Sequence, residues 1–301
     1  MKKPIAGTAA GILAIVLWST TVALVRSLTE QLGPLTAAAS VYIVGGLASG
    51  VRFLLSPGHL KSLFQLPRKY LFGCGALFIL YMTALFAAIG FSKDRIQVLE
   101  VGLLNYLWPP LTIIFSLGLL NRRANWILIP GTLLAVTGMA IILAGEETLS
   151  WESLIKNFFE NPVAYLLGLT AAVSWALYSN LTRRWAGGHP EGAVDLFMPV
   201  TGCVFLAFSL TLESMPGYTQ RAVLETVFLG LATYLGYGLW DYAMRQGEVV
   251  LVAACSYLTP LLSTLISVFY LRVSPTQGLW IGCALLVTGS LLSWFSVEAT
   301  K

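Results

Sequence analysis

The sequence predicts an all-α integral membrane protein with ten transmembrane helices in two inverted five-helix repeats. Three observations lead to this prediction: the composition, a series of apolar runs, and a motif that occurs twice. Of the 301 residues, 57% are hydrophobic and only 11% are charged, whereas globular proteins carry about 25% charged residues. The mean hydropathy is +0.78. Lipid is therefore the expected solvent for most of the chain.

Ten apolar runs, bounded by charged residues, proline and glycine, account for nearly the whole chain. A membrane-spanning helix needs roughly 20 residues. Inside lipid every backbone polar group must find its partner within the segment, so each run is expected to be a helix. The connections are short and leave no room for a separate soluble domain. The runs lie at about 5–28, 33–55, 69–91, 96–119, 124–145, 162–182, 192–212, 223–245, 248–271 and 276–297.

The motif that occurs twice interrupts the fourth and ninth runs. Positions 105–110 read Asn-Tyr-Leu-Trp-Pro-Pro and positions 257–260 read Tyr-Leu-Thr-Pro, so a Tyr-Leu-x-Pro pattern stands in both. Proline removes a backbone donor and clashes with the preceding turn. We therefore expect Pro109, Pro110 and Pro260 to be hinges where the helices open. Two interrupted membrane helices at matching places in two halves point to the substrate site of a transporter.

Similarity between the two halves extends beyond this motif. Val-Thr-Gly at 136–138 matches the same string at 287–289, an offset of 151 residues, and Trp18 matches Trp175 at an offset of 157. Each half has five runs, an odd number, so the two copies must cross the membrane in opposite senses. The predicted organisation is a first repeat at 1–147, a connecting helix at 148–161 and a second repeat at 162–301.

The connecting segment 148–161 has a pattern of its own. Its apolar residues recur at helical spacing, while Glu152, Lys156 and Glu160 take the opposite face. This is typical of an amphipathic helix that lies on a membrane surface. We interpret it as a strap joining the two repeats, with a gate as the alternative. The apolar residues are Trp151, Leu154, Ile155, Phe158 and Phe159.

The distribution of positive charge predicts the orientation. With the N-terminus in the cytoplasm, the inside segments hold 12 of the 18 Lys and Arg residues and the outside segments hold 6. Cytoplasmic loops carry an excess of these residues, so both termini are expected in the cytoplasm. The basic residues are spread over short loops and form no patch, which argues against a nucleic-acid partner.

Three stretches resemble one known family. They are Trp-Ser-Thr at 18–20, Asn-Tyr-Leu-Trp-Pro at 105–109, and the segment from Gly131 to Gly138. Over the whole chain the sequence resembles the drug/metabolite transporter superfamily, and more narrowly the aromatic amino acid exporters of bacterial inner membranes. The resemblance implies a multi-pass protein of the inner (plasma) membrane that exports Phe, Tyr and Trp by alternating access. It departs from the broad family where Asn121 and Leu271 stand, since a Glu often follows the fourth and ninth spans.

An exporter of aromatic amino acids needs a cavity that accepts a ring, and partners for one carboxylate and one ammonium. Aromatic rings gain roughly 0.5–1.5 kcal/mol from offset or edge contacts, and an ammonium can rest on a ring face. Instead of binding substrate, an aromatic side chain in such a protein can anchor the helix at the membrane interface or pack in the core. The candidate substrate-binding residues are Trp18, Tyr81, Asn105, Tyr106, Trp108, Trp175, Tyr178 and Tyr257, with Tyr42 and Trp240 as further candidates for the cavity wall.

Among these candidates, Asn105 is the polar one nearest the proline break. It stands one turn before Pro109, where freed backbone groups collect. Its amide is expected either to bind the carboxylate of the substrate or to tie neighbouring helices together.

We single out two of the acidic residues in the predicted spans, Glu100 and Asp241, because ionisable groups inside a membrane are functional candidates by default. Asp241 has Arg245 one turn further along, which predicts a local i,i+4 ion pair. Glu100 is expected near the outer end of the fourth span, with Arg95 or Arg26 as its partner. Since neither looks central, we expect facilitated transport rather than strong proton coupling.

Other functions compete with this interpretation. A transporter of a different amphipathic or cationic compound, with or without proton coupling, is the first alternative. An intramembrane enzyme has little to build on, because the two histidines, His59 and His189, lie in loops and no metal-binding pattern is present. A channel would need rings of charges or carbonyls that the sequence does not offer. We expect no cofactor and no metal, the lipid bilayer and a small molecule as partners, and a monomer.

Overall fold

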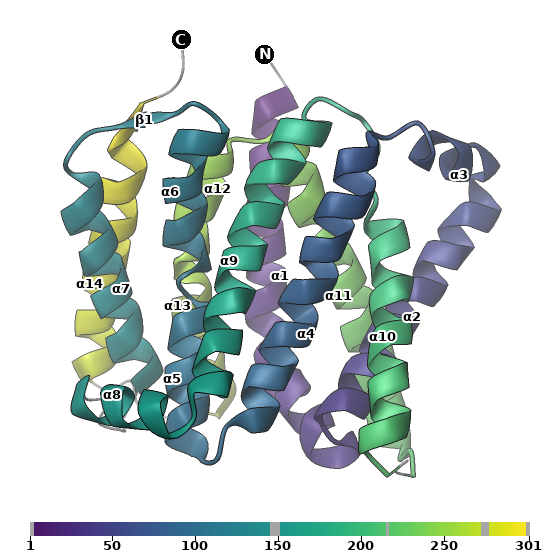
Figure 1. The fold of residues 1–301 in the computed structure, drawn as a ribbon, viewed down its shortest axis with the longest axis horizontal. Helices are drawn as coiled ribbons and strands as arrows, with labels where there is room; N and C mark the ends of the chain where they lie inside the picture. The colour runs from purple at the N-terminus through teal and green to yellow at the C-terminus, as the bar shows by residue number, and fades with distance from the viewer. Residues whose placement is uncertain (1–2, 145–150, 215–216, 272–276, 299–301) are drawn as a thin grey trace. The chain divides into compact units, whose positions relative to one another are not determined.

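The structure, a computed structural model, describes residues 3–144, 151–214, 217–271 and 277–298 (Figure 1). Almost all of these residues are helical, which confirms the predicted all-α class. The first half contains α1 (Lys3–Leu32), α2 (Pro34–Leu55), α3 (Pro57–Leu63), the π-helical segment η1 (Lys69–Cys74), α4 (Gly75–Phe91), α5 (Arg95–Asn105), α6 (Trp108–Leu119), β1 (Arg123–Ala124) and α7 (Leu128–Ala144). The second contains α8 (Trp151–Glu160), α9 (Pro162–Ala186), α10 (Val194–Leu212), α11 (Gln220–Gln246), α12 (Val249–Ser256), α13 (Leu258–Leu271), α14 (Gln277–Phe295) and β2 (Val297–Glu298).

The helices coincide with the ten predicted spans. Within the described residues, seven helical segments are long and apolar enough to cross a membrane, and 5–21 and 128–142 are shorter apolar helices. The ninth predicted span corresponds to α12 followed by α13, which are separated at a single residue, Tyr257. The third span begins in π-helical form at Lys69 and continues as α4.

The chain forms two compact units that both draw on the two halves of the sequence. Unit 1 consists of residues 1–79 and 181–248, and unit 2 consists of residues 80–180 and 249–301. Each unit therefore combines segments from both predicted repeats, 1–147 and 162–301, and does not coincide with either of them. The boundaries of the repeats stay a prediction.

Close helix contacts at glycine hold unit 1 together. A Cβ at Gly46 of α2 would collide with Pro199 of α10, and a Cβ at Gly7 of α1 would collide with the backbone at Gly247, just after α11. These glycines allow helices to approach closely, as small residues do in membrane proteins. Gly50, by contrast, faces open space.

In unit 2, α7 and α14 run side by side (Figure 1). A Cβ at Gly138 would collide with the backbone at Leu286, and a Cβ at Gly289 would collide with the backbone at Ala135. The two Val-Thr-Gly strings that marked the repeat therefore meet in one interface. Beyond these helices, β1 pairs antiparallel with β2 in a short two-residue ladder.

The predicted amphipathic connection is present as α8. Figure 1 shows this helix lying across the ends of the other helices of its unit. Phe158 packs edge-on against Tyr165 of α9 with ring centroids 6.0 Å apart, while Ile155 and Phe159 are exposed. The start of the predicted segment, 148–150, and the side chain of Trp151 lie outside the described residues.

Candidate functional site

The first predicted helix break lies between α5 and α6. The helix stops at Asn105, and Tyr106 and Leu107 form a turn with φ/ψ of −67°/3° and −72°/−8°. Pro109 and Pro110 occupy the first turn of α6, where a helix has no partners for its amides in any case. Because proline cannot donate, the carbonyls of Asn105 and Tyr106, four residues earlier, lose their helical donors. The predicted break is confirmed.

The second break, between α12 and α13, is built differently. It is a single turn residue, Tyr257, whose amide donates to the carbonyl of Ala254 at 3.3 Å. Pro260 cannot donate to the carbonyl of Ser256, four residues earlier. The hydroxyl of Thr259 donates to that carbonyl instead, at 2.9 Å. The polar group that this proline frees is therefore satisfied locally.

Four of the predicted aromatic residues come together in unit 2. Trp175 of α9 lies at their centre, with the Tyr81 ring centroid 4.7 Å away. Trp108, at the start of α6, meets Trp175 edge-on at 6.3 Å. Tyr178 stacks on Trp175 at 5.0 Å. Three of these side chains are buried and Tyr81 is half-buried, so we call this group the Trp175 cluster.

Asn105 is buried beside the break, with 8% of its surface exposed. Its Oδ1 atom has no hydrogen-bond partner among the described residues. Burying an amide oxygen without a partner costs about 1–3 kcal/mol. Such a cost in a helix break marks this oxygen as a candidate ligand-binding atom.

The structure does not bring Tyr106 and Tyr257 into the Trp175 cluster. Tyr257 is fully buried in the apolar core of unit 2, beside residues such as Ile113 and Val250, and Tyr106 packs against the same core. These contacts fit the core-packing role that the sequence left open for them.

Trp18 belongs to unit 1 and has an aromatic group of its own. Its ring lies 5.3 Å from Tyr237 and 5.4 Å from Trp240, both on α11. Tyr237 meets Phe78 edge-on at 5.0 Å and Tyr42 at 6.3 Å. We call this the Trp18 cluster. Sequence reasoning named Tyr42 and Trp240 as wall candidates but missed Tyr237 and Phe78, which have no local signal that separates them from lipid-facing aromatics.

Glu100 of α5 is buried and accepts hydrogen bonds from neutral side chains. Ser153 donates at 2.9 Å and Asn157 at 3.0 Å, both from α8, and the hydroxyl of Tyr165 donates from α9. The side chains of the two expected partners, Arg95 and Arg26, lie outside the described residues. Glu100 thus fastens α8 to its unit, and the choice between strap and gate stays a prediction.

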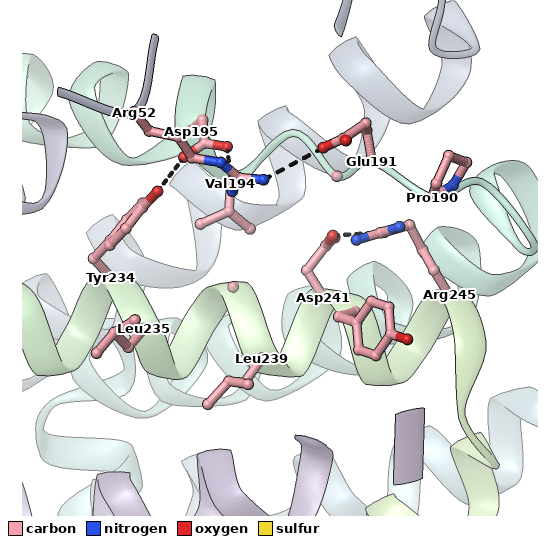
Figure 2. Close-up of a pocket in the computed structure, with 13 residues that line it drawn as sticks. Arg52, Pro190, Glu191, Val194, Asp195, Tyr234, Leu235, Leu239, Asp241 and Arg245 are labelled. Carbon is pink, nitrogen blue, oxygen red and sulfur yellow. Dashed lines mark hydrogen bonds and ion pairs between the residues drawn. The ribbon is translucent and has the colours of Figure 1, made fainter. Parts of the chain in front are cut away.

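Asp241 forms the predicted ion pair with Arg245 at 2.8 Å, and both side chains are buried. The hydroxyl of Tyr70 donates to the other carboxylate oxygen at 2.7 Å. This pair lines a cavity of about 240 Å³ in unit 1 (Figure 2). Sequence analysis did not foresee the cavity, because its lining residues come from α2, α10, α11 and the loop before α10.

A second ionic group lines the same cavity. Arg52 of α2 lies 3.0 Å from Asp195 and 3.4 Å from Glu191, and Tyr234 of α11 donates to Asp195 at 2.6 Å (Figure 2). Among the described residues, no group of three or more His, Cys, Asp and Glu side chains is arranged to hold a metal ion.

Comparison with known proteins decides the family. The profile of the EamA-like transporter family matches residues 5–144 and 162–295. This chain belongs to the EamA-like transporter family. It is therefore a multi-pass membrane protein and a transporter rather than an enzyme, and the two matched halves are consistent with a ten-helix inverted repeat. The resemblance to the drug/metabolite transporter superfamily is confirmed.

Named relatives match over nearly the full length. The chain is 31% identical to the aromatic amino acid exporter YddG of Escherichia coli K12, covering 97% of both chains. It is 32% identical to YddG of Salmonella typhimurium 14028s, again over 97% of both. It is 30% identical to YddG of Ancylobacter novellus, over 95% of this chain and 96% of that one. A solved crystal structure, 29% identical, matches with a TM-score of 0.81 over 96% of this chain and 97% of the other.

Proposed function

We propose that this transporter exports the aromatic amino acids Phe, Tyr and Trp across the bacterial inner membrane by facilitated alternating access. The observation that carries the proposal is the full-length similarity, at 30–32% identity, to three proteins named as aromatic amino acid exporters. The excess of Lys and Arg in the loops supports cytoplasmic termini, and we take the functional unit to be a monomer.

The ring of the substrate would bind at the Trp175 cluster. Tyr81, the half-buried member, is the natural face for an incoming ring, and Trp108 and Trp175 already meet at the edge-on angle that aromatic pairs prefer. Each added ring contact is worth roughly 0.5–1.5 kcal/mol beyond area burial. Trp18, in unit 1, stays a separate candidate for binding a ring.

The ammonium of the substrate would bind at the α5–α6 break. An ordinary helix break exposes carbonyls on one side and amides on the other. Here Pro109 and Pro110 remove the two amides that would bond the carbonyls of Asn105 and Tyr106, and the Oδ1 atom of Asn105 has no partner among the described residues. An ammonium offers three donors and no acceptor. The break therefore suits the ammonium better than the carboxylate.

The environment of the acids supports transport without proton coupling. Glu100 is occupied by three donors and Asp241 is paired with Arg245. A proton carrier must gain and lose its proton as the transporter turns over, and both carboxylates have structural partners that would oppose this cycle.

A second candidate function is export of an aromatic amine or another amphipathic cation. The partnerless Oδ1 atom of Asn105 favours this function, because an ammonium without a carboxylate is enough to satisfy that acceptor. The two functions differ in whether the protein must bind a carboxylate, because an amino acid carries this group and an amine does not.

Flux of labelled phenylalanine in proteoliposomes tests the proposal. With equal pH on both sides, we expect saturable flux that unlabelled Trp and Tyr reduce and Lys and Glu do not. Flux that requires an imposed pH gradient would overturn facilitated transport. Absence of flux for all three aromatic amino acids, with folded protein, would overturn the substrate.

A further inference from the structure

A buried asparagine in α9 joins this helix to α6. The side chain of Asn180 is fully buried, and its Nδ2 atom lies between two backbone carbonyl oxygens. It donates to Thr112 of α6 at 3.0 Å and to Ala176 of α9, one turn earlier, at 2.9 Å. Because both neighbours of this atom are acceptors, the geometry fixes which end of the amide is the nitrogen. Asn180 thus provides a hydrogen bond from one helix to another within unit 2.

The amide oxygen of the same side chain is in a less favourable place. The Oδ1 atom of Asn180 is buried and has no hydrogen-bond partner among the described residues. An amide oxygen buried in this way costs free energy, and asparagine is a weak helix former. Hydrogen bonds between membrane helices contribute little to stability on average. Stability alone therefore accounts poorly for this residue, and its bond to Thr112 indicates a role in placing α6.

The bond lies one turn beyond the Trp175 cluster on both helices. Trp108 of α6 meets Trp175 of α9 edge-on at 6.3 Å. Thr112 follows Trp108 by four residues, and Asn180 follows Trp175 by five. The hydroxyl of Thr112 also donates to the carbonyl of Trp108 at 2.7 Å. α6 is therefore attached to α9 at two successive levels, and a chain of hydrogen bonds runs from Asn180 to the backbone of Trp108.

This attachment matters because the link between α6 and α5 is weak. Pro109 and Pro110 cannot donate to carbonyls of the preceding turn, so the start of α6 lacks two bonds that a continuous helix would have. A helix interrupted in this way can rotate at the break. The bond from Asn180 opposes such a rotation, which would carry Trp108 away from its place in the cluster.

We propose that Asn180 is a positioning residue that sets the place of Trp108 in the ring site, and thereby the size of ring that the transporter selects. This inference rests on the function proposed above. With the bond to Thr112 in place, Trp108 stands at a fixed distance from Trp175. Without that bond α6 turns at its proline break, and the space open to a ring changes. A site discriminates substrates by the contacts that differ between them, and phenylalanine and tryptophan differ in the size of the ring.

Asn180→Thr separates the two hydrogen bonds of the side chain. Threonine is close to asparagine in size, and its hydroxyl donates to a carbonyl one turn earlier in its own helix. The variant therefore keeps a bond to Ala176 and loses the bond to Thr112. Ser179→Ala is the matched control, because Ser179 is also fully buried and its hydroxyl donates within α9, to the carbonyl of Trp175 at 2.9 Å.

The position of Trp108 can be read without substrate. Full-length protein that carries 5-fluorotryptophan, in nanodiscs, gives fluorine signals from its tryptophans, and Trp108→Phe identifies the signal of Trp108. We expect this signal to shift or split in Asn180→Thr and to keep its place in Ser179→Ala. The signal of Trp126, which is 77% exposed, should not change in either variant. A Trp108 signal that is the same in Asn180→Thr as in the wild type would overturn the proposal, as would an equal shift in Ser179→Ala.

Selectivity in proteoliposomes provides the second test. The ratio of kcat/KM for tryptophan to kcat/KM for phenylalanine should change about threefold or more in Asn180→Thr, the scale of one hydrogen bond between membrane helices. It should keep its wild-type value in Ser179→Ala. Loss of folded protein lowers both values together and leaves their ratio unchanged, so the ratio reports the shape of the site.

The outcomes distinguish this inference from the function on which it rests. An unchanged ratio in Asn180→Thr, with flux in the wild type, would overturn the role of Asn180. Absence of flux for both amino acids in the folded wild type would overturn the proposed substrate instead, and the fluorine measurement would still decide whether Asn180 sets the position of Trp108.

Discussion

The two broken helices of unit 2 start from the same Tyr-Leu-x-Pro pattern but differ in what happens to the freed polar groups. At the α12–α13 break, the hydroxyl of Thr259 occupies the carbonyl of Ser256. At the matching position of the α5–α6 break stands Trp108, which has no hydroxyl, and a second proline follows. The comparison teaches that the second break satisfies the carbonyl that its proline frees, while the first break leaves the Oδ1 atom of Asn105 without a partner among the described residues.

The aromatic residues at the two breaks also have different neighbours. Trp108 reaches from the first break into the Trp175 cluster. Tyr257 at the second break is buried in the apolar core of its unit. The two breaks of the repeat therefore differ in their surroundings, and only the first fits the ligand-binding role proposed above.

Replacement of Trp108 should have the largest effect on transport. Trp108→Ala removes the edge-on contact with Trp175 and one wall of the proposed ring site, so phenylalanine flux should fall roughly tenfold, as expected for a ring contact of up to about 1.5 kcal/mol. Trp126→Ala is the matched control, because Trp126 is 77% exposed. Equal flux in the two variants, at equal amounts of folded protein, would remove the first break from the site.

The anchoring of α5 offers a second way to sharpen the comparison. α5 is tied through Glu100 to α8 and α9, whereas α12 contains no charged residue. Glu100→Gln should cost about 1–3 kcal/mol, because a carboxylate with three donors becomes an amide that cannot accept all of them. We expect lower thermal stability in detergent and faster hydrogen exchange in α8.

Lys156→Gln is the control for this variant, because the Lys156–Glu160 pair is exposed and spans 3.9 Å. Exposed pairs of this kind contribute at most about 0.5 kcal/mol. Exchange in α8 that is equally fast in both variants would show that Glu100 does not anchor the strap.

The smallest effect is expected at the second break. Thr259→Val keeps the shape of the side chain and leaves the carbonyl of Ser256 without the hydroxyl that it accepts from. The free energy of unfolding should fall by about 1 kcal/mol, while phenylalanine flux at saturating substrate should stay near the wild-type rate. A large loss of flux with intact stability would mean that the second break also binds substrate.

The parts of this protein that sequence alone predicts are those set by local chemistry. Proline at positions 109, 110 and 260 dictates where helices break, and the Asp241–Arg245 pair follows from helical spacing. The strap α8 follows from its periodicity. The grouping of Tyr81, Trp108 and Trp175 was anticipated in part, because Trp108 adjoins a break and Trp175 recurs in both repeats.

The remaining features depend on contacts between distant segments. Ser153 lies 53 residues from its partner Glu100, and His59 lies 136 residues from Asp195. No spacing rule links such positions in one sequence. Tyr106 and Tyr257 share the motif of the site but pack into the core, because the direction of a side chain at a break is set by neighbouring helices.

The central claim, that the α5–α6 break with the Oδ1 atom of Asn105 binds the ammonium of the substrate, is tested most directly by competition. Labelled phenylalanine flux is measured with phenethylamine, which lacks the carboxylate, and with phenylpropionate, which lacks the ammonium. The wild type should be inhibited far more strongly by the amine, and Asn105→Leu should lose that preference while Ser256→Ala, at the matching position of the second break, should keep it. Stronger inhibition by phenylpropionate, or an amine preference that survives in Asn105→Leu, would contradict the account.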